Sequence, residues 1–133
     1  MTMNSSTYNS LTTAGFKPEQ ALQIRKTMVT QEKGIKYTLE IKDNHPSVVF
    51  QVDGYIVKSG RKCDKLVLIN TKNESPEEWT QIFVELKGHD AIHGIEQLLD
   101  TAKNEKFSDK SNKTRKARLV ATSIPSNRAN PMV

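Results

Sequence analysis

Two short apolar segments followed at once by an amphipathic segment limit the folds open to this chain. Residues 63–69 and 82–86 are rich in β-branched and aliphatic side chains, which favour buried strands. A continuous apolar stripe then predicts a helix over residues 90–103 with Asp90 as its N-cap, formed by Ala91, Ile92, Ile95, Leu98, Leu99 and Ala102. Strand, strand and helix in this order predict an α/β fold with the helix on the sheet.

The flanking segments add further elements to this sheet. Pro18 at a first helical position, apolar residues at helical spacing and a closing Gly34 predict a helix over residues 18–33. Alternating apolar residues over 35–41 and 48–57 predict two strands that could form a hairpin. Residues 119–124 predict a final strand, which Pro125 ends.

The chain has 133 residues, which corresponds to a single domain. Residues 1–17 are rich in Ser, Thr and Asn and are expected to form a flexible arm. The folded domain is then expected over residues 18–124, followed by a short flexible tail over residues 125–133.

Charge and cysteine content narrow the class of partner and the compartment. The net charge of +5 and the isoelectric point near 9.4 favour a polyanionic partner, although many basic proteins bind no nucleic acid. The single cysteine, Cys63, excludes an intramolecular disulfide and is typical of a reducing compartment. No segment has the apolar length of a signal peptide core or a membrane span, so a cytoplasmic protein without membrane contact is expected.

Three charged residues occupy unexpected places in the apolar segments. Glu85 and Lys87 are two residues apart, so they share one face at the end of a core strand. Asp64 stands at the start of the preceding apolar run. If the two strands are neighbours, Asp64 and Glu85 converge on one site with oxygen ligands.

Such a site suits Mg²⁺ or Mn²⁺, because these hard ions accept few protein carboxylates and keep several waters. A bound divalent ion activates water and neutralises developing charge, and an adjacent lysine stabilises phosphate oxygens. The residues therefore predict metal-dependent hydrolysis of a phosphodiester. A short E-x-K pattern also arises by chance as a solvated ion pair, which is the alternative to a catalytic site.

Asp64, twenty intervening residues and then Glu85-Leu86-Lys87 resemble the PD-(D/E)XK nuclease superfamily. The resemblance implies a restriction-endonuclease-like αβββαβ core, with a mixed central sheet flanked by helices. It implies that Asp64 and Glu85 ligate the metal, that Leu86 contributes its carbonyl and that Lys87 assists the nucleophile. Many members, small resolvases among them, place a Gln on the next helix, which makes Gln97 a further candidate.

The sequence departs from the superfamily pattern at two positions. Cys63 stands where a Pro often precedes the Asp, and Thr101 stands where some members have a Tyr one turn after the Gln. The subfamily therefore stays open. Some members take another ligand from a Glu on the first helix, for which Glu19 and Glu32 are candidates at opposite ends of the predicted helix.

A basic segment after the predicted helix offers contacts to nucleic acid. Residues 104–116 are expected to form a surface loop that holds phosphates without reading bases, through Lys106, Lys110, Lys113, Arg115 and Lys116. DNA is the expected substrate of an endonuclease of this kind. A junction resolvase or an RNA-directed nuclease is an alternative, because the catalytic residues do not encode substrate shape.

Three other interpretations of the sequence compete with a nuclease. His89 and His93 are one helical turn apart, as in zinc proteases, but no third ligand follows, so surface histidines are expected. Cys63 is expected to be a buried, inert thiol. The third interpretation is a non-catalytic module on the same fold that binds nucleic acid or protein. The oligomeric state is a separate question, for which a homodimer stays open.

Overall fold

A computed structural model describes residues 6–32, 34–59, 62–74, 76–87 and 91–121 of the chain. The elements follow one another in the order α1 (Thr7–Thr13), β1 (Gln20–Ile24), β2 (Thr27–Glu32), β3 (Ile35–Glu40), β4 (Pro46–Gln51), β5 (Lys65–Lys72), β6 (Glu78–Lys87), α2 (Ala91–Ala102), the short 3₁₀ helix η1 (Glu105–Phe107) and β7 (Asn112–Ala121).

A mixed five-stranded sheet forms the centre of the fold, in the order β1-β4-β5-β6-β7. The pairs β1/β4, β4/β5 and β5/β6 are antiparallel, and β6/β7 is parallel. A parallel pair needs a crossover connection, which here contains α2. The α/β class, the mixed sheet, the two apolar strands and the helix after them are therefore as the sequence predicts.

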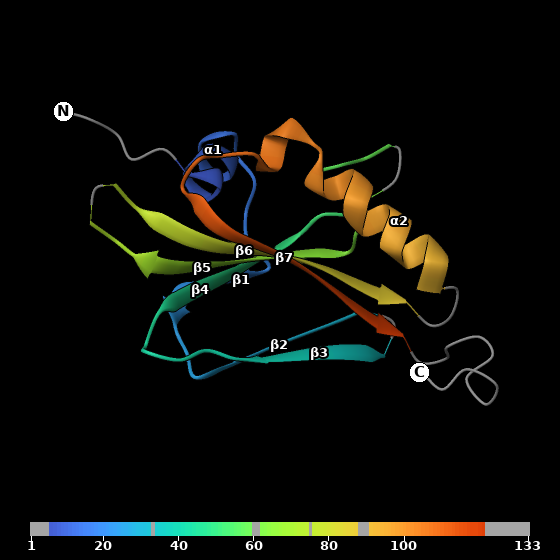
Figure 1. The fold of residues 1–133 in the computed structure, drawn as a ribbon, viewed down its shortest axis with the longest axis horizontal. Coiled ribbons are helices and arrows are strands. Elements are labelled where there is room, and N and C mark those ends of the chain that lie inside the picture. Colours follow the sequence, from blue (N-terminus) through green and yellow to red (C-terminus); the bar gives the residue numbers. More distant parts are fainter. Residues whose placement is uncertain (1–5, 33, 60–61, 75, 88–90, 122–133) are drawn as a thin grey trace.

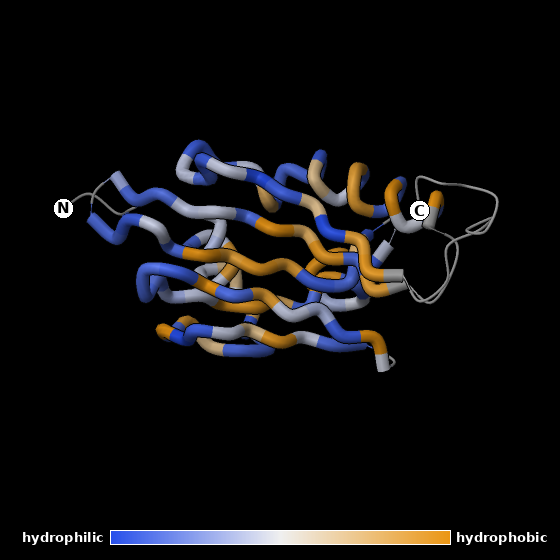
Figure 2. Tube along the Cα trace, turned by 60° about the horizontal axis from the view of Figure 1, so that its bottom comes forward, coloured by the Kyte–Doolittle hydropathy of each residue, from blue (hydrophilic) through white to orange (hydrophobic). Residues whose placement is uncertain are grey.

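The central sheet is covered on both faces (Figure 1). Helices α1 and α2 lie on one face, where Leu11 and Leu98 pack into a core with Phe50 and Phe83. A separate two-stranded sheet of β2 and β3 lies on the other face, where Met28 packs among residues of β4, β5 and β6. Because the middle strands are buried on both faces, their side chains are largely apolar (Figure 2).

The helix predicted over residues 18–33 is wrong. The segment forms β1 and β2, and in β2 exposed and buried residues alternate so that Met28 and Thr30 face the core. Gly34, expected to close a helix, has a φ of +81° in the connection from β2 to β3. The hairpin predicted for 35–41 with 48–57 is also wrong, because β3 pairs with β2 whereas β4 pairs with β1 and β5.

The flexible arm predicted for residues 1–17 is corrected over residues 6–13. Ser6 caps α1 by accepting a hydrogen bond from the backbone N–H of Asn9 at 3.0 Å. Leu11 is buried, and the Thr7 hydroxyl donates to the Phe107 carbonyl at 3.2 Å. The apolar contact and the cap together hold this segment on the domain. Residues 1–5 and the tail predicted for 125–133 lie outside the described residues.

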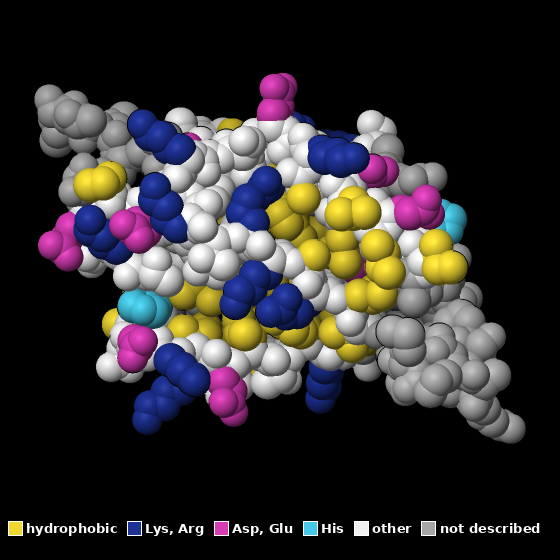
Figure 3. Space-filling view, viewed as in Figure 1, with side chains coloured by type: hydrophobic (Ala, Val, Ile, Leu, Met, Phe, Trp, Pro, Cys, Tyr) yellow, Lys and Arg dark blue, Asp and Glu magenta, His cyan; other side chains and the backbone are white. Residues whose placement is uncertain are grey.

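Helix α2 buries only part of the predicted apolar stripe, because Leu98 and Ala102 pack against the core. Ile92, Ile95 and Leu99 are exposed, and hydrophobic side chains gather over α2 in Figure 3. Leu98 is buried, and a Cβ added at Gly94 would lie only 2.6 Å from Cδ1 of Leu119. Gly94 therefore allows α2 to approach β7 closely. None of the described helices is both long and apolar enough to cross a membrane.

The basic loop and the final strand are also placed differently from the prediction. β7 begins at Asn112, so Lys113, Arg115 and Lys116 lie on an edge strand and not in a loop. Lys106 lies on η1 and Lys110 precedes β7. The predicted end of the final strand at Ile124 lies outside the described residues.

Candidate functional site

Asp64 lies directly before β5 and is held against β6. Its carboxylate Oδ2 accepts the backbone N–H of Leu86 at 2.8 Å, and its own N–H donates to the Val84 carbonyl at 3.1 Å. Its carbonyl accepts the N–H of Val52 at 2.9 Å, which also links it to the segment after β4. Asp64 is only 8 % exposed, so these bonds fix a buried carboxylate beside the Glu85-Leu86-Lys87 segment.

The regular strand pairing is interrupted at Asp64. Lys65 is the residue opposite Val84, yet the N–H of Asp64 also bonds to Val84, so two consecutive residues face one residue of β6. This is the pattern of a β-bulge, which re-aims a side chain at the end of a strand. Asp64 consequently reaches Leu86 and is not simply the cross-strand partner of Glu85.

Burial raises the pKa of the Asp64 carboxyl above its ordinary value of 3.8. The hydrogen bond from Leu86 opposes this shift, the negative charges of Glu32 and Asp53 add to it, and the positive charge of Lys65 also opposes it. A buried carboxylate under these influences gains from a nearby cation, because the cation favours its ionised form.

Glu85 lies on β6 beneath helix α2. Its side chain is 2 % exposed, and its Cγ lies 3.4 Å from where a Cβ on Gly94 would stand. The glycine thus leaves room for α2 to cover this carboxylate. Glu85 faces the helix, whereas the charges of Glu32 on β2 and of Asp53 after β4 act on Asp64, and Glu85 is not among the groups that shift the Asp64 pKa. The convergence of the two carboxylates on one site therefore stays a prediction.

Leu86 and Lys87 complete the segment predicted to carry chemistry. The N–H of Leu86 points to Asp64, and the N–H and C=O of a strand residue lie on the same side, so the Leu86 carbonyl also faces the start of β5. The backbone of Lys87 ends β6 opposite Ala121. The side chain of Lys87 lies outside the described part of the structure.

Gln97 on α2 reaches toward the start of β5. Its Nε2 donates to the Lys62 carbonyl at 3.2 Å. Its Oε1 atom is buried and accepts no hydrogen bond from the described residues. A buried amide oxygen without a donor is costly, so it marks a place where a ligand or water with N–H or O–H groups would fit.

Thr101, which the sequence offered only as a departure from a motif, joins α2 to the same segment. Its hydroxyl accepts the N–H of Cys63 at 2.7 Å and donates to the Gln97 carbonyl at 2.7 Å. Cys63 itself is fully buried, and burial raises the pKa of its thiol to about 12, a direction that the charges of Glu85 and Asp64 reinforce. The thiol is therefore not a nucleophile at neutral pH, in agreement with the inert cysteine expected from the sequence.

A second charged cluster, not foreseen from the sequence, surrounds Lys65. Its ammonium donates to Glu19 Oε1 at 2.5 Å and Gln51 Oε1 at 2.7 Å and lies 3.3 Å from Glu32 Oε2. Glu19 precedes β1 and Glu32 ends β2, so neither glutamate stands on a first helix. Both were candidate metal ligands, but each is paired with a lysine that is 2 % exposed.

The five basic residues predicted to hold phosphates are all exposed, and two of them also make contacts within the domain. Arg115 is held by internal contacts, because its Nε donates to Gln81 Oε1 at 2.6 Å and its guanidinium lies 5.5 Å from the centre of the Phe83 ring. Lys106 donates to the Ile56 carbonyl at 3.2 Å. Lys110, Lys113 and Lys116 are exposed. Arg118, which the sequence did not single out, adds an exposed cation on β7.

The described residues contain no group of three or more His, Cys, Asp or Glu side chains arranged to hold a metal. His93 is exposed on α2, as expected for a surface histidine, and His89 lies outside the described residues. A divalent-ion site formed by Asp64, Glu85 and the Leu86 carbonyl therefore stays a prediction from the sequence.

Comparison of the chain with protein-family models, with curated proteins and with solved structures gave no match.

Proposed function

We propose that the protein is a divalent-metal-dependent nuclease that hydrolyses nucleic-acid phosphodiester bonds. The observation that carries this proposal is the hydrogen bond from the Leu86 N–H to Asp64 Oδ2. It seats one buried carboxylate against the Glu85-Leu86-Lys87 segment, although the two are twenty residues apart in sequence. Pairing of β5 with β6 brings Asp64 to this segment. A chance E-x-K pattern in the sequence would not by itself be accompanied by such a carboxylate.

The order of elements supports the same proposal. With β1, β2 and β3 set aside as additions, the remaining elements run α1, β4, β5, β6, α2 and β7. This is the helix, three strands, helix and strand order of the PD-(D/E)XK superfamily that the sequence resembles. Asp64 then precedes the second of these three strands and Glu85 lies on the third.

The residues around Asp64 fit a Mg²⁺ or Mn²⁺ ion. The carboxylates of Asp64 and Glu85 and the carbonyl of Leu86 are the oxygen ligands such ions prefer, and burial of two carboxylates calls for a compensating cation. Gln97 Oε1 is available to accept a hydrogen bond from a water at such a site. When bound, the ion would lower the pKa of a water and neutralise charge on the phosphate.

The remaining roles fall to residues of β6 and β7. We assign to Lys87 the stabilisation of charge that develops on the phosphate oxygens, because a lysine two residues after Glu85 shares its strand face. The exposed Lys113, Lys116 and Arg118 provide positive charge along the edge strand for the backbone of DNA. Arg115 is set aside from this role because its guanidinium already donates to Gln81 Oε1 and to the Ala102 carbonyl.

Cleavage assays with purified protein test this function. Supercoiled plasmid, linear duplex, single-stranded DNA, RNA and a four-way junction are incubated with Mg²⁺ or Mn²⁺, and with chelator in a parallel series. We expect cleavage of at least one DNA substrate that stops with chelator and is absent in Asp64→Asn. Binding of these substrates without any metal-dependent cleavage would instead identify a non-catalytic module and refute the proposal.

A further inference from the structure

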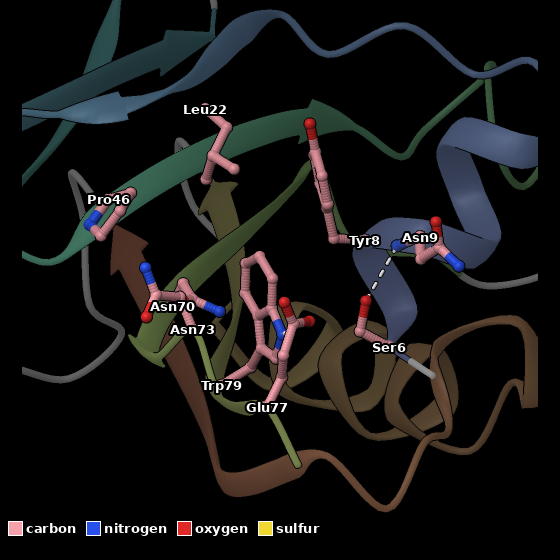
Figure 4. A pocket seen from close by; sticks show the side chains of 9 residues that line it. All are labelled: Ser6, Tyr8, Asn9, Leu22, Pro46, Asn70, Asn73, Glu77 and Trp79. Atoms are coloured by element: carbon pink, nitrogen blue, oxygen red, sulfur yellow. Dashed lines mark hydrogen bonds between the residues drawn. The ribbon is translucent and has the colours of Figure 1, made fainter. Parts of the chain in front are cut away.

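A pocket of about 380 Å³ opens at the end of the sheet away from Asp64. Asn70, which lines it, is six residues along β5 from Asp64, or roughly 20 Å in an extended strand. Figure 4 shows the pocket with side chains from α1, β1, β4, β5 and β6 around it. It is therefore separate from the proposed nuclease site and joins parts of the chain that are far apart in sequence.

Flat apolar groups form one part of the pocket wall. The rings of Tyr8 and Trp79 stack with centroids 5.5 Å apart and an angle of 24° between their planes. Leu22 and Pro46 add further apolar surface. The volume is near the lower end of the range for small-molecule sites, so it suits one ring system with its substituents and not an extended chain.

The side chains of Asn70 and Asn73 also line the pocket. Asn70 is 5 % exposed, yet its side-chain amide makes no hydrogen bond with any described residue. The amide of Asn73 and the hydroxyl of Tyr8 likewise make none within the described part of the chain. Figure 4 shows the side chains of Asn70 and Asn73 among those that line the pocket. The Asn70 side chain carries both an amide donor and a carbonyl acceptor, so it can pair with a ligand that offers both.

The charge of the wall disfavours an anionic group at this point. Glu77 is the one charged residue among the described residues that line the pocket, and Trp79 Nε1 donates to its Oε1 at 3.2 Å. The carboxylate is thereby held beside the aromatic wall and can accept N–H groups of a ligand. A planar ligand equipped with N–H donors fits this part of the wall.

A second hollow continues from the pocket. It measures about 270 Å³, shares Pro46, Asn70 and Asn73 with the first, and adds His45 and Lys72 as well as Glu74. It provides space outside the aromatic wall for a sugar and, beside Lys72, for a phosphate.

We propose that this pocket binds a purine base. The ring lies against the Tyr8 and Trp79 wall, and the Asn70 and Asn73 amides pair with the base edge, as amide side chains do in base recognition. Glu77 accepts N–H groups, which selects guanine, because guanine presents a ring N–H and an amino group side by side. The proposal does not depend on nuclease activity, since binding is measured without metal or cleavage.

Tryptophan fluorescence provides a direct readout because Trp79 is the single tryptophan of the chain and lines the pocket. Guanosine, adenosine and cytidine are titrated into the full chain with chelator present, and calorimetry repeats the titrations. We expect saturable binding of guanosine, weaker binding of adenosine and none of cytidine. Guanosine 5′-monophosphate should bind at least as well as guanosine, because its phosphate lies outside the base pocket.

Three variants separate specific binding from general effects. Asn70→Leu and Glu77→Gln should each weaken guanosine binding by at least about tenfold. Each substitution removes a group that pairs with the base, and loss of one such contact changes the affinity by about this factor. Gln23→Leu is the matched control, an amide exposed on β1 outside the pocket, and should leave the affinity within about twofold. Thermal unfolding of each variant checks that it is folded, and Glu77→Gln changes no apolar packing.

Absence of saturable binding for every nucleoside would overturn the proposal. Guanosine binding that both Asn70→Leu and Glu77→Gln leave unchanged would overturn it as well, because the base would then lie elsewhere. Neither result affects the nuclease proposal, whose test is metal-dependent cleavage at the opposite end of β5.

Discussion

Replacement of Thr101 by valine should destabilise the domain and loosen the start of β5. The side chain is 1 % exposed, and its hydroxyl accepts the N–H of the fully buried Cys63 at 2.7 Å. Valine has nearly the same shape but no acceptor, so the N–H of Cys63 would stay buried without a partner. This segment also carries Asp64, which makes the bond relevant to the proposed site.

The expected cost follows from the loss of that single acceptor. A buried N–H without a partner costs about 1–3 kcal/mol, so we expect a fall of about 2 kcal/mol in the free energy of unfolding. With a urea m-value of about 1–3 kcal/mol/M, the midpoint of unfolding should fall by roughly 1 M. The carbonyl of Gln97 also loses the hydroxyl as a donor, but a helical carbonyl retains its backbone partner.

Thr101→Ser is the control, because it keeps the hydroxyl and removes one methyl group at a cost of about 1 kcal/mol. Amide hydrogen exchange distinguishes the two effects. The Cys63 amide should exchange faster in Thr101→Val and remain protected in Thr101→Ser. If Thr101→Val is as stable as the wild type and protects the Cys63 amide equally well, the role assigned to this hydrogen bond is refuted.

Three further outcomes are expected. Lys87→Ala should lower the rate of cleavage by at least ~10²-fold with little change in metal or substrate affinity, and near-normal turnover would remove Lys87 from catalysis. Because burial raises the pKa of Asp64 in the folded state, its contribution to stability is present below its ordinary value of 3.8 and is lost as pH rises through the folded pKa. Urea unfolding of Asp64→Asn between about pH 4 and 7 should therefore show a smaller fall than the wild type, and equal slopes would contradict the shift. Arg115→Ala leaves Oε1 of the fully buried Gln81 without its donor and should cost about 2 kcal/mol, whereas the exposed Lys113→Ala should stay within about 0.5 kcal/mol; equal effects would mean that the Arg115 contacts carry no net stability.

The elements that the sequence predicted well are those whose pattern is strong over their whole length. Residues of β5 and β6 are buried on both faces, so their apolar runs indicate strands without knowledge of their partners. Helix α2 has an apolar stripe at helical spacing, which predicts a helix correctly. The spacing does not reveal which part of the stripe packs: Leu98 is buried and Gly94 approaches β7, whereas Ile92, Ile95 and Leu99 are exposed.

The error over residues 18–33 has a physical explanation. Met28 fits both a helical stripe and the alternation of β2, and the β-branched Thr27, Val29 and Thr30 favour a strand. What decides between the two is the pairing of β2 with β3 and the packing of Met28 on the central sheet. Tertiary contacts of this kind are not visible in a single sequence.

The proposed site could be predicted only in part. The position of Asp64 before β5 and of Glu85 on the neighbouring β6 follows from the order of the apolar runs. The bulge at Asp64 and the Lys65 cluster depend on the exact register and on glutamates from the first strands. Likewise the Asn70 pocket gathers residues from α1 to β6, and no local signal marks it.

Single-turnover cleavage by Glu85→Gln tests the central claim most directly. The substitution keeps the shape of the buried side chain beneath α2 but removes the charge that the proposed metal site requires. With saturating Mg²⁺ or Mn²⁺ and the DNA that wild-type protein cleaves best, we predict that cleavage is abolished while DNA binding and thermal unfolding are nearly unchanged. Cleavage at the wild-type rate by folded Glu85→Gln would contradict the assignment of a metal-dependent nuclease site to these residues.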